Sequence, residues 1–163
     1  MSSAPALPRI VLTEGGSGDL DAVMRIMGSA FDCRFGEGWS KSQCAGILPL
    51  GGVSLTMACD ARGEAHGFAL VRCVADEAEL LLLAVEQAAQ AQGFGTALLQ
   101  AFIADGKAGG HRLLHLEVRD GNGAMALYER YGFRQIGRRR DYYRGVDGAR
   151  HDAVTMALNL TGK

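Results

Sequence analysis

The stretch LEVRDGNGAMALYERYGF, residues 116–133, predicts a strand, a turn and a short helix in immediate succession. Apolar and polar side chains alternate around Glu117, so its carboxylate should leave the sheet on the face opposite Leu116 and Val118. One face of this strand would then join the core. The other face would be available for chemistry.

The helix predicted after this strand has start and stop signals at both ends. Asn122 is a preferred N-cap, good helix formers occupy 124–131, and Gly132 suits the left-handed residue that closes a helix. This helix would carry Tyr128 close to Glu117, and an acid and a phenol on adjacent elements could take and give protons on two sides of one reacting centre. The alternative is a surface glutamate and a packed tyrosine, which is the commoner outcome for an isolated pair.

The composition is typical of one ordinary globular domain. At 163 residues, the chain can bury roughly two thirds of its unfolded surface in a single core. We therefore expect one domain over residues 1–163, with residues 1–8 as a loose N-terminal arm. Hydrophobic content of 48%, charged content of 21% and a formal net charge of -1 give no general attraction for nucleic acid or an anionic membrane. We therefore expect no direct binding to nucleic acid or a membrane. We expect the protein to be a monomer or a homodimer.

Cysteine usage and hydropathy indicate a cytoplasmic protein. The four cysteines lie in apolar stretches without a CxxC pair, and the first residues lack the apolar segment of a secretory signal. The longest apolar run, residues 80–85, is far too short to span a bilayer. We expect reduced and mostly buried thiols.

The rest of the chain shows helical spacing before and after a block of strand-like alternation, which predicts an α+β fold. A strand, helix and strand over residues 78–118 predict a parallel crossover, and the last two strands should pair with each other. The expected strands are 9–13, 53–60, 66–74, 78–85, 113–118, 133–139 and 153–160, and the expected helices are 18–31, 40–48 with Ser40 as its cap, 95–107 and 124–131.

A glycine-rich segment precedes the helix at 95–107. Gln90, Gly93 and Gly95 form a QxxGxG pattern after a buried strand. Backbone amides at a helix start are unpaired and carry partial positive charge, so they bind a phosphate that glycine allows to approach. A dinucleotide-binding unit would stand in the first strand-helix unit, and a P-loop would need a lysine before Thr96. The pattern predicts a pyrophosphate loop of another kind, or a purely structural helix start.

The ordered series of motifs resembles the GNAT superfamily of acyl-CoA-dependent N-acyltransferases, and within it the RimI-type ribosomal-protein N-terminal alanine acetyltransferases. The resemblance covers about residues 39–158. It implies a GNAT fold, which has three αβα layers and a mixed, mostly antiparallel central sheet that is splayed at the acyl-CoA site. The series consists of QxxGxG, LEVR and NxxAxxLYxxxGF, together with Trp39-Ser40, residues 76–78, residues 139–143, Asp152-Ala153 and residues 156–158.

The resemblance also implies roles for individual residues, with acetyl-CoA as co-substrate and no metal. Glu117 would be the general base and Tyr128 the general acid. The expected acetyl-CoA contacts are Leu83, Ala84 and Val85 on the strand, Gln90, Ala91, Gln92, Gly93, Phe94, Gly95 and Thr96 in the loop, and Asn122. The expected substrate contacts are Trp39, Tyr142 and Asp152, although Trp39 could equally be a core residue.

The implied reaction is direct transfer of the acetyl group to the N-terminal α-amine of a protein such as a ribosomal protein. An α-amine, with a pKa near 8, is roughly a tenth neutral at pH 7, whereas a lysine side chain is under about 0.1% neutral. A carboxylate acting through water serves the α-amine more easily. The alternatives are a GNAT enzyme for a small amine, such as an amino acid, polyamine or drug, and a non-catalytic acyl-CoA sensor.

Two departures from the family pattern qualify this expectation. Ala91 and Gln92 stand where RimI-type loops usually carry arginines, so the pyrophosphate lacks a charge-assisted contact of about 1.5–3 kcal/mol unless Arg138 or another cation compensates. His151 precedes Asp152 where an acid is expected, which leaves the substrate preference open.

Two other patterns carry less weight. His111 and His115 are four residues apart but fall across a loop and a strand, which is poor spacing for zinc. The arginines at 138–140 form one cluster in a near-neutral chain, so a solvated strand or a grip on the peptide substrate is favoured over RNA binding.

Overall fold

The computed structural model describes residues 4, 6 and 8–162, and most of the expected arm at residues 1–8 lies outside the described residues. Seven strands form one sheet in the order β1-β2-β3-β4-β5-β7-β6. Among the described strands only β4 and β5 are parallel, so the sheet is mixed and mostly antiparallel, as predicted. The strands are β1 (Val11–Glu14), β2 (Val53–Cys59), β3 (Ala65–Val74), β4 (Glu77–Val85), β5 (Leu113–Arg119), β6 (Arg134–Arg144) and β7 (Arg150–Asn159).

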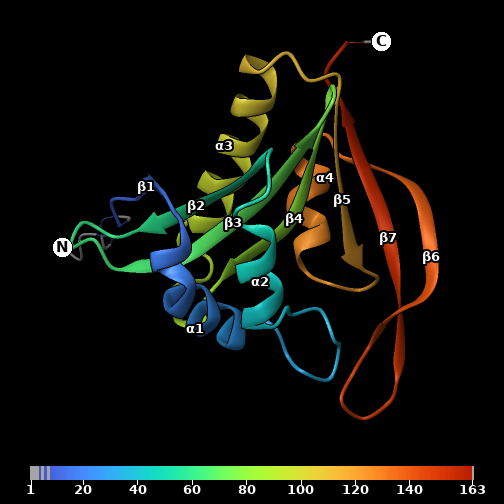
Figure 1. The fold of residues 1–163 in the computed structure, drawn as a ribbon, viewed down its shortest axis with the longest axis horizontal. Coiled ribbons are helices and arrows are strands. Elements are labelled where there is room, and N and C mark those ends of the chain that lie inside the picture. The colour runs from blue at the N-terminus through green and yellow to red at the C-terminus, as the bar shows by residue number, and fades with distance from the viewer. Residues whose placement is uncertain (1–3, 5, 7, 163) are drawn as a thin grey trace.

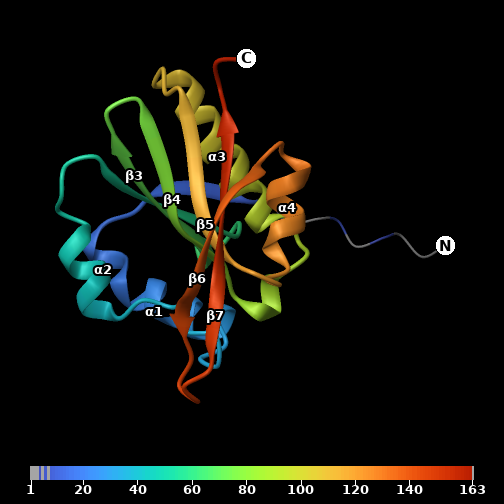
Figure 2. The same ribbon diagram turned by 90° about the vertical axis from the view of Figure 1, so that its right-hand side faces the viewer.

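Helices cover both faces of the sheet, which confirms the three-layer α+β architecture (Figures 1 and 2). The core on one face contains Leu98, Leu99 and Phe102 of α3, which packs on β3 and β4, together with Tyr128 of α4. The core on the other face contains Val23, Ile26 and Met27 of α1, with Cys44 of α2. The helices are α1 (Leu20–Ala30), α2 (Lys41–Ile47), α3 (Phe94–Ala108) and α4 (Ala124–Arg130), and short 3-10 turns are η1 (Ser17–Asp19) and η2 (Gln87–Ala89).

The cap predicted for α2 is confirmed. The Ser40 hydroxyl oxygen accepts from the Gln43 backbone N–H at 3.1 Å, and the Ser40 N–H donates to the Gln43 side chain at 2.7 Å. This reciprocal pair satisfies two backbone donors at the helix start. It fixes where the chain leaves the loop at 31–40 and enters the helix.

The two parallel strands are paired over only part of their length. Pairing runs from Glu77 opposite Leu113 to Leu80 opposite Leu116 and then stops. The register between β3 and β4 also shifts here, leaving Leu81 without a partner in the described ladder. Such a bulge bends a strand and increases its twist. The second half of β4 therefore diverges from β5, and the expected splay of the sheet is confirmed.

The last hairpin is longer than predicted. The sequence indicated strands at 133–139 and 153–160, but β6 continues to Arg144 and β7 begins at Arg150. Between them the register jumps from Arg139 opposite Ala153 to Tyr143 opposite His151. This irregularity breaks the alternation of apolar and polar residues on which the prediction rested, so the sequence pattern ended too early.

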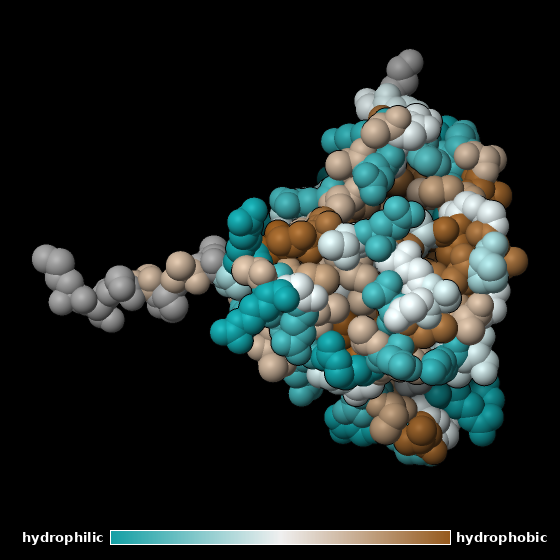
Figure 3. Space-filling model, turned by 60° about the vertical axis from the view of Figure 1, so that its left-hand side comes forward, coloured by the Kyte–Doolittle hydropathy of each residue, from teal (hydrophilic) through white to brown (hydrophobic). Residues whose placement is uncertain are grey.

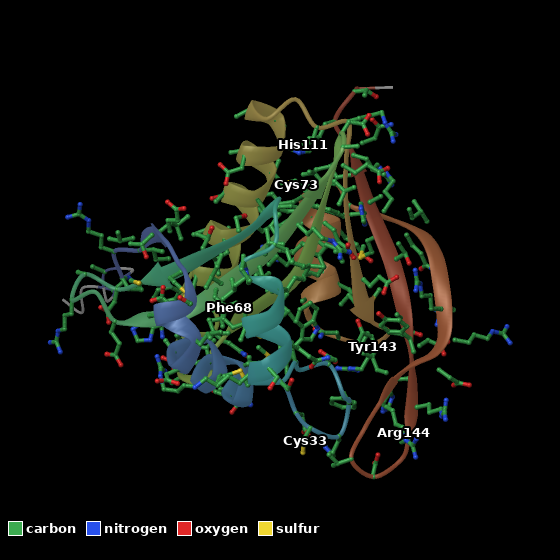
Figure 4. The ribbon with its side chains drawn as sticks, viewed as in Figure 1. Cys33, Phe68, Cys73, His111, Tyr143 and Arg144 are labelled. Atoms are coloured by element: carbon green, nitrogen blue, oxygen red, sulfur yellow. The ribbon has the colours of Figure 1, made fainter. Side chains whose placement is uncertain are left out.

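The tip of this hairpin is locked to the loop at 31–40. The Val146 N–H donates to the Cys33 carbonyl at 3.2 Å. A Cβ on Gly36 would lie 2.1 Å from the Arg144 carbonyl oxygen, and Gly36 has a φ of +69°. Only glycine fits so close to another backbone in this conformation. Figure 4 shows Cys33 and Arg144 on the two facing segments.

The surface has no dominant apolar region on the face shown in Figure 3, where brown residues of the described chain are interrupted by teal and white ones. The helices of the described chain include none that is both long and apolar enough to cross a membrane.

Candidate active site

The divergence of β4 from β5 opens a cavity of about 740 Å³. Its walls come from the end of β4, the loop into α3, β5, α4, the loop at 31–40 and the end of β6. Of the predicted site residues, all except Gln92 and Asp152 line it: Trp39, Leu83, Ala84, Val85, Gln90, Ala91, Gly93, Phe94, Gly95, Thr96, Glu117, Asn122, Tyr128 and Tyr142. The sequence therefore identified most of a cavity that is assembled from distant parts of the chain.

The loop before α3 presents unpaired backbone donors. Gly93, with a φ of +96°, is the N-cap of α3, and Ala91 also has a positive φ of +61°. Within the described chain, none of the amides from Ala91 to Thr96 has a hydrogen-bond acceptor. The start of a 15-residue helix with such amides is suited to an anion. The loop carries no cation of its own.

Gly95 is not required by packing within the chain. A Cβ at this position would meet Leu127 and Val85 at 3.7 Å, which is ordinary van der Waals contact. Its φ lies outside the left-handed region. A close approach by a ligand remains as the physical reason for a glycine there.

The two glutamines of this loop hold it in place. The Gln90 Nε2 donates to the Val85 carbonyl at 3.1 Å, and the Gln92 Nε2 donates to the Ala88 carbonyl at 3.1 Å. Gln92, which was predicted to contact acetyl-CoA, does not line the cavity. It lies in the loop between Ala91 and Gly93, which both line the cavity.

The end of β4 turns backbone groups toward the gap. The Glu86 N–H donates to the His66 carbonyl at 2.9 Å, so by the alternation of an antiparallel pair the N–H and C=O of Leu83 and Val85 point away from β3. Ala84 is paired with Phe68 and its side chain is buried on the α1 face. Leu83 can therefore pair with an extended ligand in the gap, whereas Ala84 contributes only its position in the wall.

Glu117 and Tyr142 lie next to each other in the cavity wall. The Glu117 Oε1 accepts from the Arg139 Nε at 2.8 Å, and the Glu117 side chain is 17% exposed. Burial, and then the negative charge of Glu117, raises the pKa of Tyr142. The carboxylate is thus held on the cavity wall while part of it remains accessible to water.

Tyr128 enters the cavity from α4. It is 5% exposed, and its ring packs edge-on against Phe133 with centroids 6.1 Å apart. Burial, and then the charge of Glu37, raises the pKa of the Tyr128 phenol far above its usual value. At neutral pH this group is a proton donor.

Asn122 was predicted to be the N-cap of α4, but Gly123 occupies that position. Its side chain still serves the helix start, since its Oδ1 accepts from the Ala124 N–H at 2.8 Å. The helix itself begins at Ala124, as expected. Asn122 therefore combines a capping bond with a place in the cavity wall.

Glu37 is a cavity residue that the sequence did not reveal. Its side chain is 9% exposed, its Oε2 accepts from the Asn122 Nδ2 at 2.9 Å, and its Oε1 accepts from the Arg119 Nε. The Arg119 guanidinium lies 3.7 Å from the centre of the Phe35 ring. Glu37 stands between two glycines in a loop without periodicity, so no local pattern marked it.

Trp39 was predicted to be either a core residue or a substrate contact, and its position is compatible with both. It packs, partly buried, against the core formed by α1 and also lines the cavity. Its backbone N–H donates to the Met27 Sδ at 3.0 Å.

Asp152 was predicted to contact the substrate, and in the structure it does not line the cavity. Its Oδ1 accepts from the Asp141 backbone N–H at 3.0 Å, and its Oδ2 accepts from the Arg138 Nη1 at 2.9 Å. Arg138 also donates to Asp120 at 2.7 Å. Arg138 is thus engaged at the hairpin, and it does not compensate for the missing loop arginines.

The irregular segment that Asp152 binds explains how two consecutive tyrosines reach one cavity. Adjacent residues of a regular strand point to opposite faces. At the irregularity Asp141 has a φ of +54°, and Tyr142 and Tyr143 both line the cavity with ring centroids 4.9 Å apart. Tyr143, labelled in Figure 4, was not predicted. Burial, followed by the charges of Glu117 and Glu37, raises its pKa.

The remaining histidines lie apart from these groups. The His111 Nδ1 is 3.3 Å from the Gly106 carbonyl, and the His115 Nε2 is 3.9 Å from Glu77, so the two do not converge on one point. His151 packs edge-on against Phe35, and its buried Nε2 has no hydrogen-bond partner among the described residues. His151 therefore packs against the loop at 31–40 through Phe35.

Comparison with known proteins gives the family. A family model described as an acetyltransferase (GNAT) domain matches residues 53–135. The ribosomal protein bS18-alanine N-acetyltransferase of Haemophilus ducreyi is 48% identical over 94 residues, which are 57% of this chain and 65% of that relative. The matched part spans just under two thirds of the relative's length.

Solved structures agree over nearly the whole chain. The ribosomal-protein-S18-alanine N-acetyltransferase from Escherichia coli superposes with a TM-score of 0.82 at 34% identity, covering 93% of this chain and 94% of that one. A phosphinothricin acetyltransferase from Sinorhizobium meliloti, solved in complex with AcCoA, has a TM-score of 0.77 at 20% identity, covering 93% and 88%, and shares the fold alone. Because the domain model covers half of its length and the Escherichia coli structure, at 34% identity, matches 93% of it, this chain belongs to the GNAT acetyltransferase family.

Proposed function

We propose that this chain transfers the acetyl group of acetyl-CoA to the N-terminal α-amine of a protein, and that a ribosomal protein is the physiological acceptor. The observation that carries the proposal is the cavity through the sheet, which joins unpaired loop amides at one end to Glu117 and Tyr128 at the other. The names of the relatives at 34–48% identity support the acceptor class.

The residues present fit acetyl-CoA. The amides from Ala91 to Thr96 suit a pyrophosphate, the space at Gly95 admits it, and the backbone of Leu83 suits an extended pantetheine arm. Acetyl-CoA supplies the acetyl group as an activated thioester. The chain supplies position, which alone accounts for a large part of the rate of such transfers.

Two side chains manage the protons. The incoming amine nitrogen forms a bond to the acetyl carbon, and the carbon-sulfur bond breaks. Glu117 takes the proton that the amine releases, through a water molecule, because the carboxylate lies at the accessible end of the cavity. Tyr128 gives its proton to the departing thiolate, which its raised pKa keeps available. Both protons are accounted for by groups of this chain.

The acceptor enters between Trp39 and the tyrosine pair Tyr142 and Tyr143. These aromatic side chains present apolar walls and hydroxyl groups, which suit a peptide chain. A non-catalytic acyl-CoA sensor would need neither Glu117 nor Tyr128.

The test is acetyl-CoA turnover on peptides that begin with Ala, Ser, Met or Gly, run beside a panel of small amines. We expect turnover on the peptides, with selectivity for the first residue. Turnover on small amines alone would contradict the protein acceptor. Tight acetyl-CoA binding in isothermal titration without turnover on any amine would support the sensor.

A further inference from the structure

Glu37 connects the loop at 31–40 with the start of α4 across the cavity. It is carried by the loop at 31–40, which is locked to the β6–β7 hairpin through the backbone contacts of Gly36 and Val146. Its carboxylate crosses to Asn122, which lies at the start of α4. A rigid loop on one side therefore determines the position of an amide on the other.

The bonds around Asn122 allow one orientation of its amide. A carboxylate can only accept hydrogen bonds and a backbone N–H can only donate them. Glu37 therefore takes the Asn122 Nδ2 at 2.9 Å, and the Ala124 N–H takes the Oδ1 at 2.8 Å. The Nδ2 group has a second N–H beyond the one given to Glu37, and it is available to a ligand in the cavity.

The charge of Glu37 is balanced within the same cluster. Arg119 donates to its other oxygen, and the two side chains are 14% (Arg119) and 9% (Glu37) exposed. A buried carboxylate without such a partner would be strongly destabilising. Arg119 in turn rests on the Phe35 ring. The orientation of Asn122 is thus supported by a closed set of contacts rather than by a single bond.

We propose that Glu37 is a positioning residue for acetyl-CoA: it fixes Asn122 so that an amide N–H, rather than a carbonyl oxygen, faces a carbonyl of the pantetheine arm. This inference rests on the proposed function. The alternative is a purely structural role, in which Glu37 only pairs with Arg119 and holds the loop. In that case the orientation of the Asn122 amide would not affect the binding of acetyl-CoA.

Exchanging the carboxylate of Glu37 and the amide of Asn122 distinguishes the positioning role from the structural role. In the double variant Glu37→Gln with Asn122→Asp, a hydrogen bond between the two positions and one negative charge near Arg119 are retained. The carboxylate that replaces the amide has no N–H, so the donor that faces the ligand is lost. We expect a Tm close to that of the unaltered protein, and a Kd for CoA in isothermal titration that is raised about fivefold or more, as the loss of one hydrogen bond implies.

A mutant cycle gives the second measurement, and it remains informative if the exchange variant does not fold. Glu37→Gln should raise the Kd for CoA several-fold in the unaltered protein and have little effect in an Asn122→Ala background. Asp147→Asn is the control, since Asp147 is an acid at the tip of the hairpin that contacts this loop, does not line the cavity, and accepts a hydrogen bond from the Ala149 N–H. We expect this control to bind CoA like the unaltered protein.

The outcomes are distinct. Equal effects of Glu37→Gln in both backgrounds, no effect in either, or unchanged CoA binding by the exchange variant would each overturn the positioning role while leaving the proposed function intact. Failure of the unaltered protein to bind CoA would overturn the proposed function, and this inference with it.

Discussion

Glu117 and Tyr128 reach the same cavity from opposite faces of the sheet. Glu117 leaves β5 on the face opposite Leu116 and Val118, whereas Tyr128 belongs to the core on the α3 and α4 side. An intact sheet would keep them apart. They meet because pairing between β4 and β5 stops at Leu80 and Leu116, so the cavity passes through the layer that would otherwise separate them.

Replacing Tyr128 with Phe should lower kcat by about 10² or more, because the departing thiolate loses its proton donor. The matched control is Tyr131→Phe, which removes a hydroxyl three residues further on, at the C-cap of the same helix, that accepts from Gln100 at 3.1 Å. Steady-state kinetics with acetyl-CoA and a peptide measure both. Wild-type turnover in the Tyr128 variant would remove its role as the acid.

Replacing Glu117 with Gln should also lower kcat by about 10² or more, since the amide cannot accept the proton of the amine. The loss should be smaller at high pH, where a larger fraction of the acceptor amine is already neutral. The measurement is kcat from about pH 6.5 to 9.5 for both proteins. A constant ratio across this range would argue that Glu117 binds or orients the acceptor instead.

The pH profile also tests the acid. Because the pKa of Tyr128 is raised well above the ordinary value near 10, the phenol stays protonated throughout the usual assay range. The unaltered protein should therefore show no loss of kcat on the alkaline side up to about pH 9.5. A fall in kcat with an apparent pKa of about 8 or 9 would contradict a deeply buried acid.

Local sequence patterns were sufficient for the parts of the fold that are formed by neighbouring residues. The alternation around Glu117 places alternate side chains on opposite faces of one strand, and Gly93 supplies the positive φ that the start of α3 requires. Both requirements are met within a few residues. Contacts between residues far apart in the sequence leave no such local pattern. Glu37 acts through Asn122, which is 85 residues away, and Asp152 binds Arg138 across the hairpin. Such long-range contacts cannot be predicted from the pattern of a single sequence.

The loop glycines should respond differently to substitution by alanine. Gly93→Ala places a side chain at a φ of +96° and should cost about 1–2 kcal/mol of unfolding free energy. Gly95→Ala meets only ordinary contacts and should leave stability unchanged or slightly improved. It should nevertheless weaken CoA binding, because the methyl group would occupy the space proposed for the pyrophosphate. Thermal unfolding and isothermal titration separate the two effects, and undiminished CoA affinity in Gly95→Ala would place the pyrophosphate elsewhere.

The charged network around His66 should make stability depend on pH. His66 lies between Asp60 and Glu86, with Arg25 on the far side of Glu86, and its ring packs against Phe94 at the start of α3. Burial lowers the pKa of His66, but its bonds to Asp60 and Glu86 outweigh this, and the net pKa is raised. The hydrogen bond from His66 lowers the pKa of both acids.

The signs of these shifts define a window. The contribution of His66 is fully present below its unfolded pKa near 6.5 and is lost as the pH rises through its higher folded value. The contribution of the acids is present above about pH 4 and is lost as the pH falls below it. The network should therefore stabilise the fold most between about pH 4.5 and 6.5. Urea unfolding of the unaltered protein and of His66→Gln should differ more at about pH 5.5 than at about pH 8.5. An equal difference at both would show that folding does not raise the pKa of His66.

Asp152 should affect the acceptor side of the cavity without touching it. Its Oδ1 holds the Asp141 N–H at the irregular segment of β6, and that segment presents Tyr142 and Tyr143 to the cavity together. Asp152→Ala leaves this N–H without its acceptor and releases Arg138 to Asp120. We expect KM for the peptide to rise several-fold, as the loss of a hydrogen bond to a charged group implies, while KM for acetyl-CoA stays unchanged. Asp147→Ala is the control, because it removes an acid from the tip of the same hairpin that accepts from the Ala149 N–H. Equal rises in both KM values would show that the hairpin supports the whole fold instead of the tyrosine pair.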